Sequence, residues 1–273
     1  MLKASVIISF YNRIDYLRLV LAGFERQTFR NFEIIIADDG STEEVVTEIE
    51  KLSRQISFSL IHVWHEDKGF RKNKILNRAV LASNSEYLIF IDGDCVPHRE
   101  FVKEHISFSS PKKCLTGRRV NLSEKFTGKL NEENIKKGYL ENSLYQMIID
   151  GLFGKSDYVE RGFYVKNNYL RKYLNKKKRG LLGCNFSIYK NDLLNVNGFD
   201  ERYELPSVGE DSDVQFRLGL NGVDVASISN IAIQYHLYHK LLARPQINLD
   251  LFDEIKKSAR AYTPFGIKQV KYF

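Results

Sequence analysis

Apolar strand patterns and amphipathic helix patterns alternate along the first third of the chain. The strand-like runs are continuous and rich in β-branched residues, which is typical of strands buried on both faces of a sheet. The helix-like stretches place apolar residues on one helical face. We expect strands at 4–10, 32–37, 58–64 and 87–91, and helices at 14–27, from Ser41 or Thr42 onward, and at 72–82. This alternation predicts an α/β fold with a mostly parallel central sheet and helices on both faces.

The pattern changes at about residue 119. The next sixty or so residues are rich in Lys, Asn, Tyr and Glu and have weak helical periodicity around 139–153, which predicts an inserted, partly helical segment. Core character then returns, with an expected strand at 181–188, a helix at 209–220 and a strand-like run at 223–233. The predicted division of the chain is 1–118, an inserted segment at 119–180, a second core part at 181–244, and a partly helical tail at 245–273.

The composition is that of an ordinary soluble globular protein, with 43% hydrophobic and 27% charged residues among 273. The sequence contains no apolar run of the length that spans a bilayer, and the first residues lead directly into a strand pattern rather than a signal peptide. We therefore expect a cytoplasmic protein. The three cysteines have no metal-type spacing and are expected to be reduced thiols.

The net charge of +7 is concentrated in the middle of the chain, above all in the basic run at 176–179. Such a patch suits an anionic membrane surface, a phosphorylated acceptor or nucleic acid. No nucleic-acid-binding motif accompanies it, so we expect no nucleic-acid partner.

Two acidic motifs follow predicted strands, at the sheet edge where ligands bind in such folds. Asp92 and Asp94 flank Gly93, so both carboxylates can reach one hard cation and the glycine lets a diphosphate come close. Such a metal would neutralise a departing nucleotide diphosphate, whereas the alternative is a plain Asp-Gly turn. In the second motif, Asp38 and Asp39, a carboxylate can accept the N3–H of uracil or serve as a helix cap.

Two further groups occur late in the sequence. The acidic cluster from Gly209 to Asp213 could supply a base that deprotonates an acceptor hydroxyl, although acids at a helix start also complement the helix dipole. His236 and His239 are three residues apart, which is too long a spacing for both to point the same way on a strand. One of them could therefore bind metal while the other packs beside it or in the core.

Basic residues cluster at the start of the helix expected at 72–82. Arg71 and Lys74, together with Lys72, could hold phosphate beside the nucleotide site. The alternative for the lysines is a solvated basic helix face.

Together these motifs resemble the family 2 inverting glycosyltransferases of the GT-A fold, which is Rossmann-like. The run at 6–12 resembles the first strand and nucleotide-cradling loop of that family, and 38–41 resembles its next signature. The triplet at 92–94 resembles the DxD motif, in which Asp94 is the direct metal ligand. The resemblance implies that donor binding involves Ser9, Tyr11, Arg13, Asp39 as the uracil-binding aspartate, Arg71, Lys74, Asp92 and Gly93.

The second half resembles the carboxyl-terminal part of β-1,4-galactosyltransferases and of bacterial chondroitin-type polymerases, at 183–187, 197–200 and 209–218. In that group the aspartate of a Gly-Glu-Asp triplet is the catalytic base, which implies this role for Asp211. A histidine after the following strand completes the metal site, with His236 as first choice and His239 as second. The resemblance also implies an acceptor site formed by Asn185, Glu210 and Asp213.

The implied activity is inverting transfer of a hexose or N-acetylhexosamine from a UDP-sugar to a glycan or lipid-linked glycan, with Mn2+ or Mg2+. The halves at 1–118 and 181–244 would bind nucleotide-sugar and acceptor respectively. From the basic charge and from what is usual in the resembled family, we also expect peripheral contact with the anionic inner face of the cell membrane. Where the galactosyltransferases carry Trp-Gly-Gly before Glu-Asp, this chain has Ser207-Val208-Gly209, so the tryptophan is absent and the donor sugar stays open.

Two alternative functions make different demands on the sequence. A nucleotidyltransferase of related fold would have a glycine-rich basic loop after the first strand, and the segment from Ser9 to Arg13 contains no glycine. A non-catalytic carbohydrate-binding paralogue would be expected to lose one of the acidic motifs, all of which are present.

Overall fold

The structure is a computed structural model that describes residues 2–153, 155–206, 210–240 and 246–268. The strands are β1 (Ala4–Phe10), β2 (Phe32–Asp38), β3 (Ser59–Trp64), β4 (Tyr87–Asp92), β5 (Cys95–Pro97), β6 (Lys113–Thr116), β7 (Arg118–Asn121), β8 (Asn185–Tyr189), β9 (Asp224–Ser227) and β10 (Ile233–His236). The helices are α1 (Ile14–Phe24), α2 (Glu43–Ser53), α3 (Lys72–Ala82), α4 (Phe101–Ser107), α5 (Glu124–Thr127), α6 (Glu132–Lys136), α7 (Tyr139–Asn142), α8 (Leu144–Leu152), the 3₁₀ helix η1 (Val159–Gly162), α9 (Asn168–Leu174), α10 (Lys190–Leu194), α11 (Glu210–Leu220) and α12 (Gln246–Ser258).

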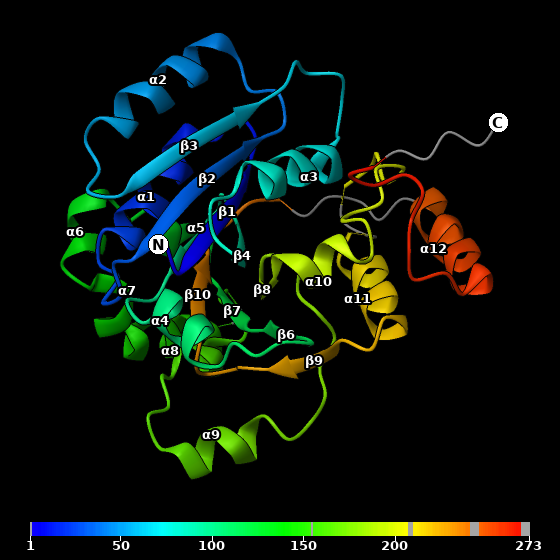
Figure 1. Ribbon diagram of the computed structural model, residues 1–273. Coiled ribbons are helices and arrows are strands. Elements are labelled where there is room, and N and C mark those ends of the chain that lie inside the picture. The colour runs from blue at the N-terminus through cyan, green and yellow to red at the C-terminus, as the bar shows by residue number, and fades with distance from the viewer. Residues whose placement is uncertain (1, 154, 207–209, 241–245, 269–273) are drawn as a thin grey trace.

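A seven-stranded sheet in the order β3-β2-β1-β4-β8-β6-β9 forms the centre of the molecule (Figure 1). The first four strands of this order are parallel, β8 runs antiparallel to both of its neighbours, and β9 is parallel to β6. The predicted α/β class with a mostly parallel sheet is therefore confirmed.

Helices cover both faces of this sheet and create two cores. Because successive side chains of a strand point to opposite faces, Val6 and Ile8 pack into one core with α1 and α2. Ile7 packs into the other core with α3, α10 and α11. This explains why the first strands are apolar without alternation.

A second sheet of three short strands, in the order β5-β10-β7, lies beside the first core. β10 pairs antiparallel with β5 and parallel with β7. The single strand expected at 223–233 is wrong, because the chain turns at 228–232 and its two ends enter different sheets as β9 and β10. Asn230 occupies a left-handed conformation in this turn, with φ of 59°, and its side-chain amide donates to the carbonyls of Glu160 and Phe163.

Two other predicted elements are shorter than expected. The strand expected at 181–188 begins only at Asn185, because its amide donates to the Leu182 carbonyl in a preceding turn (2.8 Å). The helix expected at 14–27 ends at Phe24.

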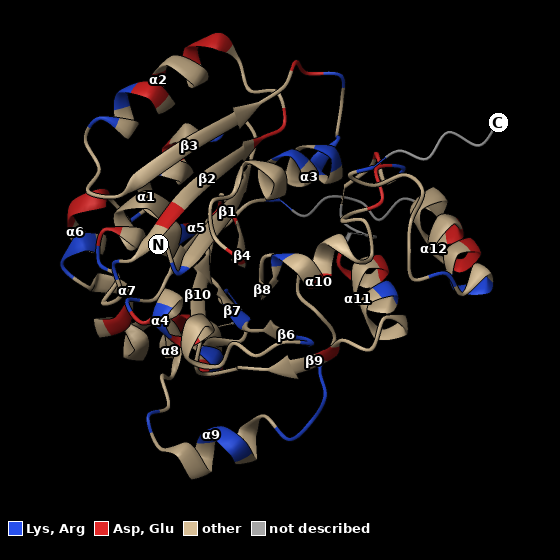
Figure 2. Ribbon diagram, viewed as in Figure 1, with Lys and Arg blue, Asp and Glu red and all other residues tan. Residues whose placement is uncertain are grey.

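Residues 119–180 form several short helices, and most of the segment is part of the main body. Its first residues belong to β7, so the boundary placed at 119 cuts through a strand. Phe126, Ile135, Leu140 and Met147 then bury their side chains in the first core. In contrast, α9 has no buried residue and projects from the molecule, and Figure 2 shows Lys and Arg on it and on its flanking loops.

No helix within the described ranges combines the length and the apolar character needed to cross a bilayer.

A buried polar cluster links α4 to the central sheet. His105 contacts the Ser187 hydroxyl through Nδ1 (2.7 Å) and Asn185 Oδ1 through Nε2 (3.1 Å). Tyr87 shares the Ser187 hydroxyl at 2.7 Å. Burial lowers the pKa of His105 to about 3, so the imidazole is neutral in the folded protein at neutral pH.

We predict that His105 makes the protein less stable in acid. Its pKa is lower in the folded chain than the ordinary 6.5, so only the unfolded chain takes up a proton as the pH falls through this range. The free energy of unfolding should fall by about 1.4 kcal/mol per pH unit from this group, from roughly pH 6.5 down to roughly pH 3. Urea unfolding between pH 7 and pH 5 should give a shallower pH dependence for His105→Gln, and equal slopes would contradict the assignment.

Candidate active site

A cleft of about 1050 Å³ lies at the carboxyl ends of β1, β2 and β4. The register of these strands explains its composition, because Ser9 on β1 lies opposite Asp92 on β4 and opposite Ala37 on β2. Of the residues singled out in the sequence, those that line the cleft are Ser9, Tyr11, Arg13, Asp39, Lys72, Asp92, Gly93, Asp94, Asp211, His236 and His239.

The two aspartates after β4 have different surroundings. Asp92 Oδ1 accepts hydrogen bonds from the Ser9 hydroxyl and from Lys72 Nζ, the latter at 3.0 Å. Between the aspartates, the Gly93 amide donates to the Ser9 carbonyl (2.8 Å), and a Cβ at Gly93 would lie only 3.0 Å from that oxygen. The absence of a side chain therefore lets this turn lie close to β1, while Asp94 contacts His236 and His239.

Asp94 and both histidines form a compact cluster. Asp94 Oδ2 lies 3.5 Å from His236 Nε2 and 3.2 Å from His239 Nε2, and the two nitrogens are 3.1 Å apart. Two ligand atoms at about 2.1 Å from one cation and at right angles to each other lie about 3.0 Å apart. The three atoms therefore have the spacing of ligands on one face of a divalent metal ion.

The two histidines converge because the second leaves the strand. His236 is the last residue of β10, and beyond it the Leu237 amide donates to the Asp94 carbonyl (2.8 Å), so the chain turns around the acidic motif. Of the two placements left open for the second histidine, the structure shows the one beside the first histidine and not the one in the core. The hydrogen bond to Asp94 raises the pKa of His239 above its ordinary value.

Asp38, the last residue of β2, and Asp39, which follows it, also differ in their surroundings. Asp38 is fully buried and caps the following turn, where Oδ1 accepts from the Ser41 amide (2.9 Å) and hydroxyl (2.6 Å). Asp39 lines the cleft, where it accepts from His65 Nε2 at 2.7 Å and from the Arg71 amide at 2.8 Å. Burial is the largest influence on the pKa of Asp39 and raises it, although these two donors oppose the shift.

The basic residues around the start of α3 differ from the prediction. Lys72 reaches the cleft through its contact with Asp92, whereas Lys74 is not among the lining residues of the described cleft. Positions two apart on a helix point about 200° apart, which explains why only one of the two lysines faces the site. Arg71 does not line it either, because its guanidinium donates to the Glu66 carbonyl.

Arg119 is a cleft residue that the sequence did not reveal. It lies on β7, beside the β10 strand that carries His236, and its guanidinium contacts Cys184 Sγ at 3.5 Å. Within the described part of the chain, no carboxylate lies in ion-pair distance of it. A strand of four residues with two charges gives no periodicity signal, so Arg119 could not be placed from sequence alone.

Asp211 approaches the cleft from the start of α11. Its Oδ1 accepts from the Ser212 amide (2.7 Å) and its Oδ2 accepts from the Gly183 amide (3.3 Å). Glu210 begins the helix, but its side chain, like residue Gly209, lies outside the described structure.

Asn185 and Asp213 are buried and do not reach the cleft, which corrects the expectation that they contact an acceptor. Asn185 is fully buried, and its amide donates to the carbonyls of Arg118 and Ala232, each at 3.0 Å. Asp213 is paired with Arg217 at 2.5 Å, and both side chains are 1% exposed. Both side chains therefore make their contacts inside the protein and not in the cleft.

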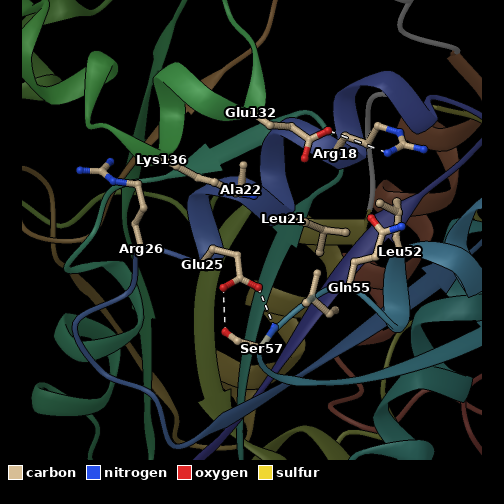
Figure 3. A pocket seen from close by; sticks show the side chains of 11 residues that line it. Arg18, Leu21, Ala22, Glu25, Arg26, Leu52, Gln55, Ser57, Glu132 and Lys136 are labelled. Carbon is tan, nitrogen blue, oxygen red and sulfur yellow. Dashed lines mark hydrogen bonds and ion pairs between the residues drawn. The ribbon is translucent and has the colours of Figure 1, made fainter.

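A second cavity, of about 460 Å³, lies between α1, α2 and α6 (Figure 3). Several of its polar groups contact one another, since Glu25 accepts from the Ser57 amide and hydroxyl and Arg18 pairs with Glu132. None of the predicted site residues lines it, so the cleft at the strand ends is the candidate active site.

Comparison with known proteins identifies the family. Residues 5–183 match the model described as glycosyl transferase family 2. The chain belongs to this family. Residues 161–240 of this family 2 member also match a model described as the N-terminal domain of galactosyltransferase, which agrees with the resemblance in its second half.

Curated relatives of this family 2 chain include much longer proteins. A chondroitin synthase of Escherichia coli is 25% identical over 246 residues, which cover 85% of this chain and 34% of the relative. An uncharacterized glycosyltransferase of Rickettsia felis is 27% identical over 154 residues, which cover 54% and 24% of the two chains. The chain thus spans between a quarter and a third of these relatives.

Solved structures confirm the GT-A fold of the family. Staphylococcus aureus TarS in complex with UDP-GlcNAc has a TM-score of 0.61 at 18% identity and covers 93% of this chain and 65% of its own. The mannosyltransferase PcManGT of Pyrobaculum calidifontis, in complex with GDP-Man and Mn2+, has a TM-score of 0.53 at 14% identity, with coverage of 87% and 57%.

The buried Asp213–Arg217 pair generates a stability prediction. Asp213→Asn leaves the Arg217 guanidinium buried without its counter-charge, which should lower the free energy of unfolding by about 3 to 5 kcal/mol. Denaturant unfolding would measure this loss. The matched change Asp211→Asn, on the cleft side of the same helix, should cost less than about 1 kcal/mol. Equal stability of the two variants would contradict a structural role for Asp213.

Proposed function

We propose that the chain catalyses inverting, metal-dependent transfer of a hexose or N-acetylhexosamine from a UDP-sugar to a glycan. The observation that carries this proposal is the arrangement of Asp94, His236 and His239 in one cleft with Asp39 and Asp211. A single cavity can thereby bind a nucleotide and a cation and place a base beside the acceptor hydroxyl.

Donor binding is assigned to the β1, β2 and β4 side of the cleft. Asp39 is held by two donors and can accept the uracil N3–H with its remaining lone pairs. Arg119 and Lys72 supply positive charge for the diphosphate. UDP as the nucleotide is supported by the TarS structures, which are complexes with UDP and UDP-GlcNAc.

Asp94, His236 and His239 would hold the metal, which we propose to be Mn2+ or Mg2+. Their mutual spacing fits a divalent cation, and the neighbouring mannosyltransferase structure contains Mn2+. When bound, the cation would stabilise negative charge on the departing diphosphate as a Lewis acid.

Asp211 is assigned the role of catalytic base. It would accept the proton of the acceptor hydroxyl while that oxygen bonds to the anomeric carbon and the bond from this carbon to the diphosphate oxygen breaks. Attack opposite the leaving group inverts the anomeric centre. The Gly183 and Ser212 amides orient the carboxylate for this step.

A bacterial surface glycan or lipid-linked glycan is the proposed acceptor. The relatives that support it are the chondroitin synthase and a Campylobacter jejuni GalNAc(5)-diNAcBac-PP-undecaprenol beta-1,3-glucosyltransferase, 29% identical over 154 residues. We propose that residues 1–118 bind the donor and that residues 181–244 bind this acceptor.

The donor can be identified by following UDP release from a panel of UDP-hexoses and UDP-N-acetylhexosamines. We expect slow hydrolysis of one donor in Mn2+ or Mg2+, suppressed by a chelator and restored by adding the metal back. GDP-mannose is the matched control and should release no nucleotide. Release that persists in chelator would contradict the metal assignment. A chain that neither binds UDP nor hydrolyses any donor would instead favour a non-catalytic carbohydrate-binding protein.

Asp211→Asn should lower transfer by about 100- to 10,000-fold, because the amide cannot take the acceptor proton. Affinity for UDP, measured by calorimetry, should be unchanged. Asp224→Asn, which makes the same chemical change at an exposed site, serves as the control and should retain activity. Normal transfer by the Asp211 variant would place the base elsewhere, and loss of UDP binding would make Asp211 a donor-binding residue.

A further inference from the structure

The helix α9 has its apolar side chains on the outside. Tyr169 is 88% exposed, Tyr173 is 69% exposed and Leu170 is 53% exposed. Residues three and four apart share one helical face, so these three side chains and Leu174 form a single apolar strip. A helix of a globular protein ordinarily turns such a strip toward the core.

Polar contacts attach the other side of α9 to the protein. Arg171 pairs with the buried Glu104 at 2.6 Å and also donates to the Val165 carbonyl at 2.6 Å. One turn later, Asn175 accepts from the Ser227 hydroxyl and the Ser229 amide, both at 2.7 Å. The helix is therefore fixed in an orientation that presents the apolar strip to solvent, although that strip contributes nothing to the described core.

The surroundings of the strip are strongly basic. Residues 161–180 contain eight Lys and Arg and no Asp or Glu, whereas the whole chain has a net charge of +7, so the rest of the chain has a net charge of −1. Five of these basic residues are exposed lysines, namely Lys166, Lys172, Lys176, Lys177 and Lys178. Lys176 Nζ lies 5.7 Å from the centre of the Tyr173 ring, which places the lysine run beside the apolar strip (Figure 2).

A different exposed strip on α8 provides a contrast. Tyr145, Ile149 and Leu152 are exposed along one face of that helix. Residues 139–153 contain no Lys or Arg, but they include Glu141 and Asp150. The strip on α8 therefore lacks the basic neighbours that surround the strip on α9.

We propose that α9 and residues 175–179 form a surface that docks peripherally on an anionic lipid membrane. Lysines are attracted to negatively charged headgroups, and aromatic and leucine side chains enter the boundary between headgroups and acyl chains. Neither signal alone gives stable anchoring, and here both are held together on one fixed element. The proposal goes beyond the transferase function and does not depend on it.

Sedimentation of the full chain with phospholipid vesicles tests the charge requirement. The chain should bind vesicles that contain phosphatidylglycerol and not vesicles of phosphatidylcholine alone, and high salt should weaken binding. Changing Lys176, Lys177 and Lys178 together to Gln should lower the partition coefficient about 100-fold. The matched control changes three exposed lysines near α5 and α6, namely Lys125, Lys129 and Lys136, to Gln and should leave binding unchanged.

The apolar strip is tested by Leu170→Ser with Tyr173→Ser, which should lower vesicle binding about 10-fold at unchanged net charge. Because α9 buries no side chain, this variant should melt like the unchanged chain and should retain its UDP release without vesicles. Equal vesicle binding by this variant would overturn the proposal. Binding to a soluble polyanion such as heparin, without binding to anionic vesicles, would overturn it as well.

Fluorescence can locate the inserted face directly. Trp64 is the single native tryptophan and lies on β3, at the edge of the central sheet away from α9 (Figure 1). A Tyr173→Trp variant should lose fluorescence when it binds anionic vesicles made with brominated acyl chains, whereas Trp64 in the unchanged chain should not. Quenching of Trp64, or an unquenched tryptophan at position 173, would place the contact on another face.

Discussion

The pairing of β10 with β5 and β7 is the constraint on which the cleft depends. His236 lies opposite Cys95 on β5 and opposite Asn121 on β7, so three segments far apart in the sequence meet in one small sheet. This register brings His236 to Asp94, the residue that precedes β5, and it brings Arg119 along β7 to the same cavity. Without this sheet, the acidic motif after β4 would face the cleft without its histidines.

The parallel strands of the central sheet could be predicted from local sequence patterns. The runs around Val6, Ile35 and Ile89 are continuous because their strands are buried on both faces, and this continuity by itself indicates a parallel sheet. From there, the carboxyl ends of the strands indicate where Asp39 and Asp92 must meet. This part of the site follows from the topology of the sheet.

The positions of the remaining site residues depend on pairing between strands that are distant in the sequence. The hydrophobic periodicity of the sequence does not reveal this pairing. β7 and β10 have four residues each, and neither forms a recognisable pattern without its partner strand. Arg119 therefore could not be assigned, and the run at 223–233 could not be divided. Lys72 and Lys74 are the same residue type, so only the direction in which each points from the helix distinguishes them.

Motif membership also does not distinguish residues that contact ligands from residues that support them. Asp213 belongs to the same motif as Asp211, and Asn185 belongs to the motif at 183–187, yet both side chains are buried and bonded to partners inside the protein. A buried ion pair adds little net stability compared with apolar packing, but it penalises every arrangement in which its partners separate. Both partners lie on α11, so the pair fixes the Arg217 guanidinium within that helix. The Arg217 bond to the Val196 carbonyl (2.8 Å) then attaches α11, with Asp211 near its start, to the chain after α10.

Hydrogen bonds also connect the cleft to the surface on α9. Asn175 holds α9 to Ser227 and Ser229, and the turn that follows them leads into β10. Asn230, within that turn, fixes the chain before α9 through the carbonyls of Glu160 and Phe163. The short turn at 228–232 is therefore linked by hydrogen bonds to α9 and to the chain before it, and it leads directly into β10, which ends at His236. The bonds of Asn175 are partly buried and those of Asn230 are exposed, and together they hold α9 in a fixed orientation to the cleft. In the function proposed above, a membrane bound at α9 would thus lie at a defined position relative to the donor, and a lipid-linked acceptor would approach Asp211 from a constrained direction.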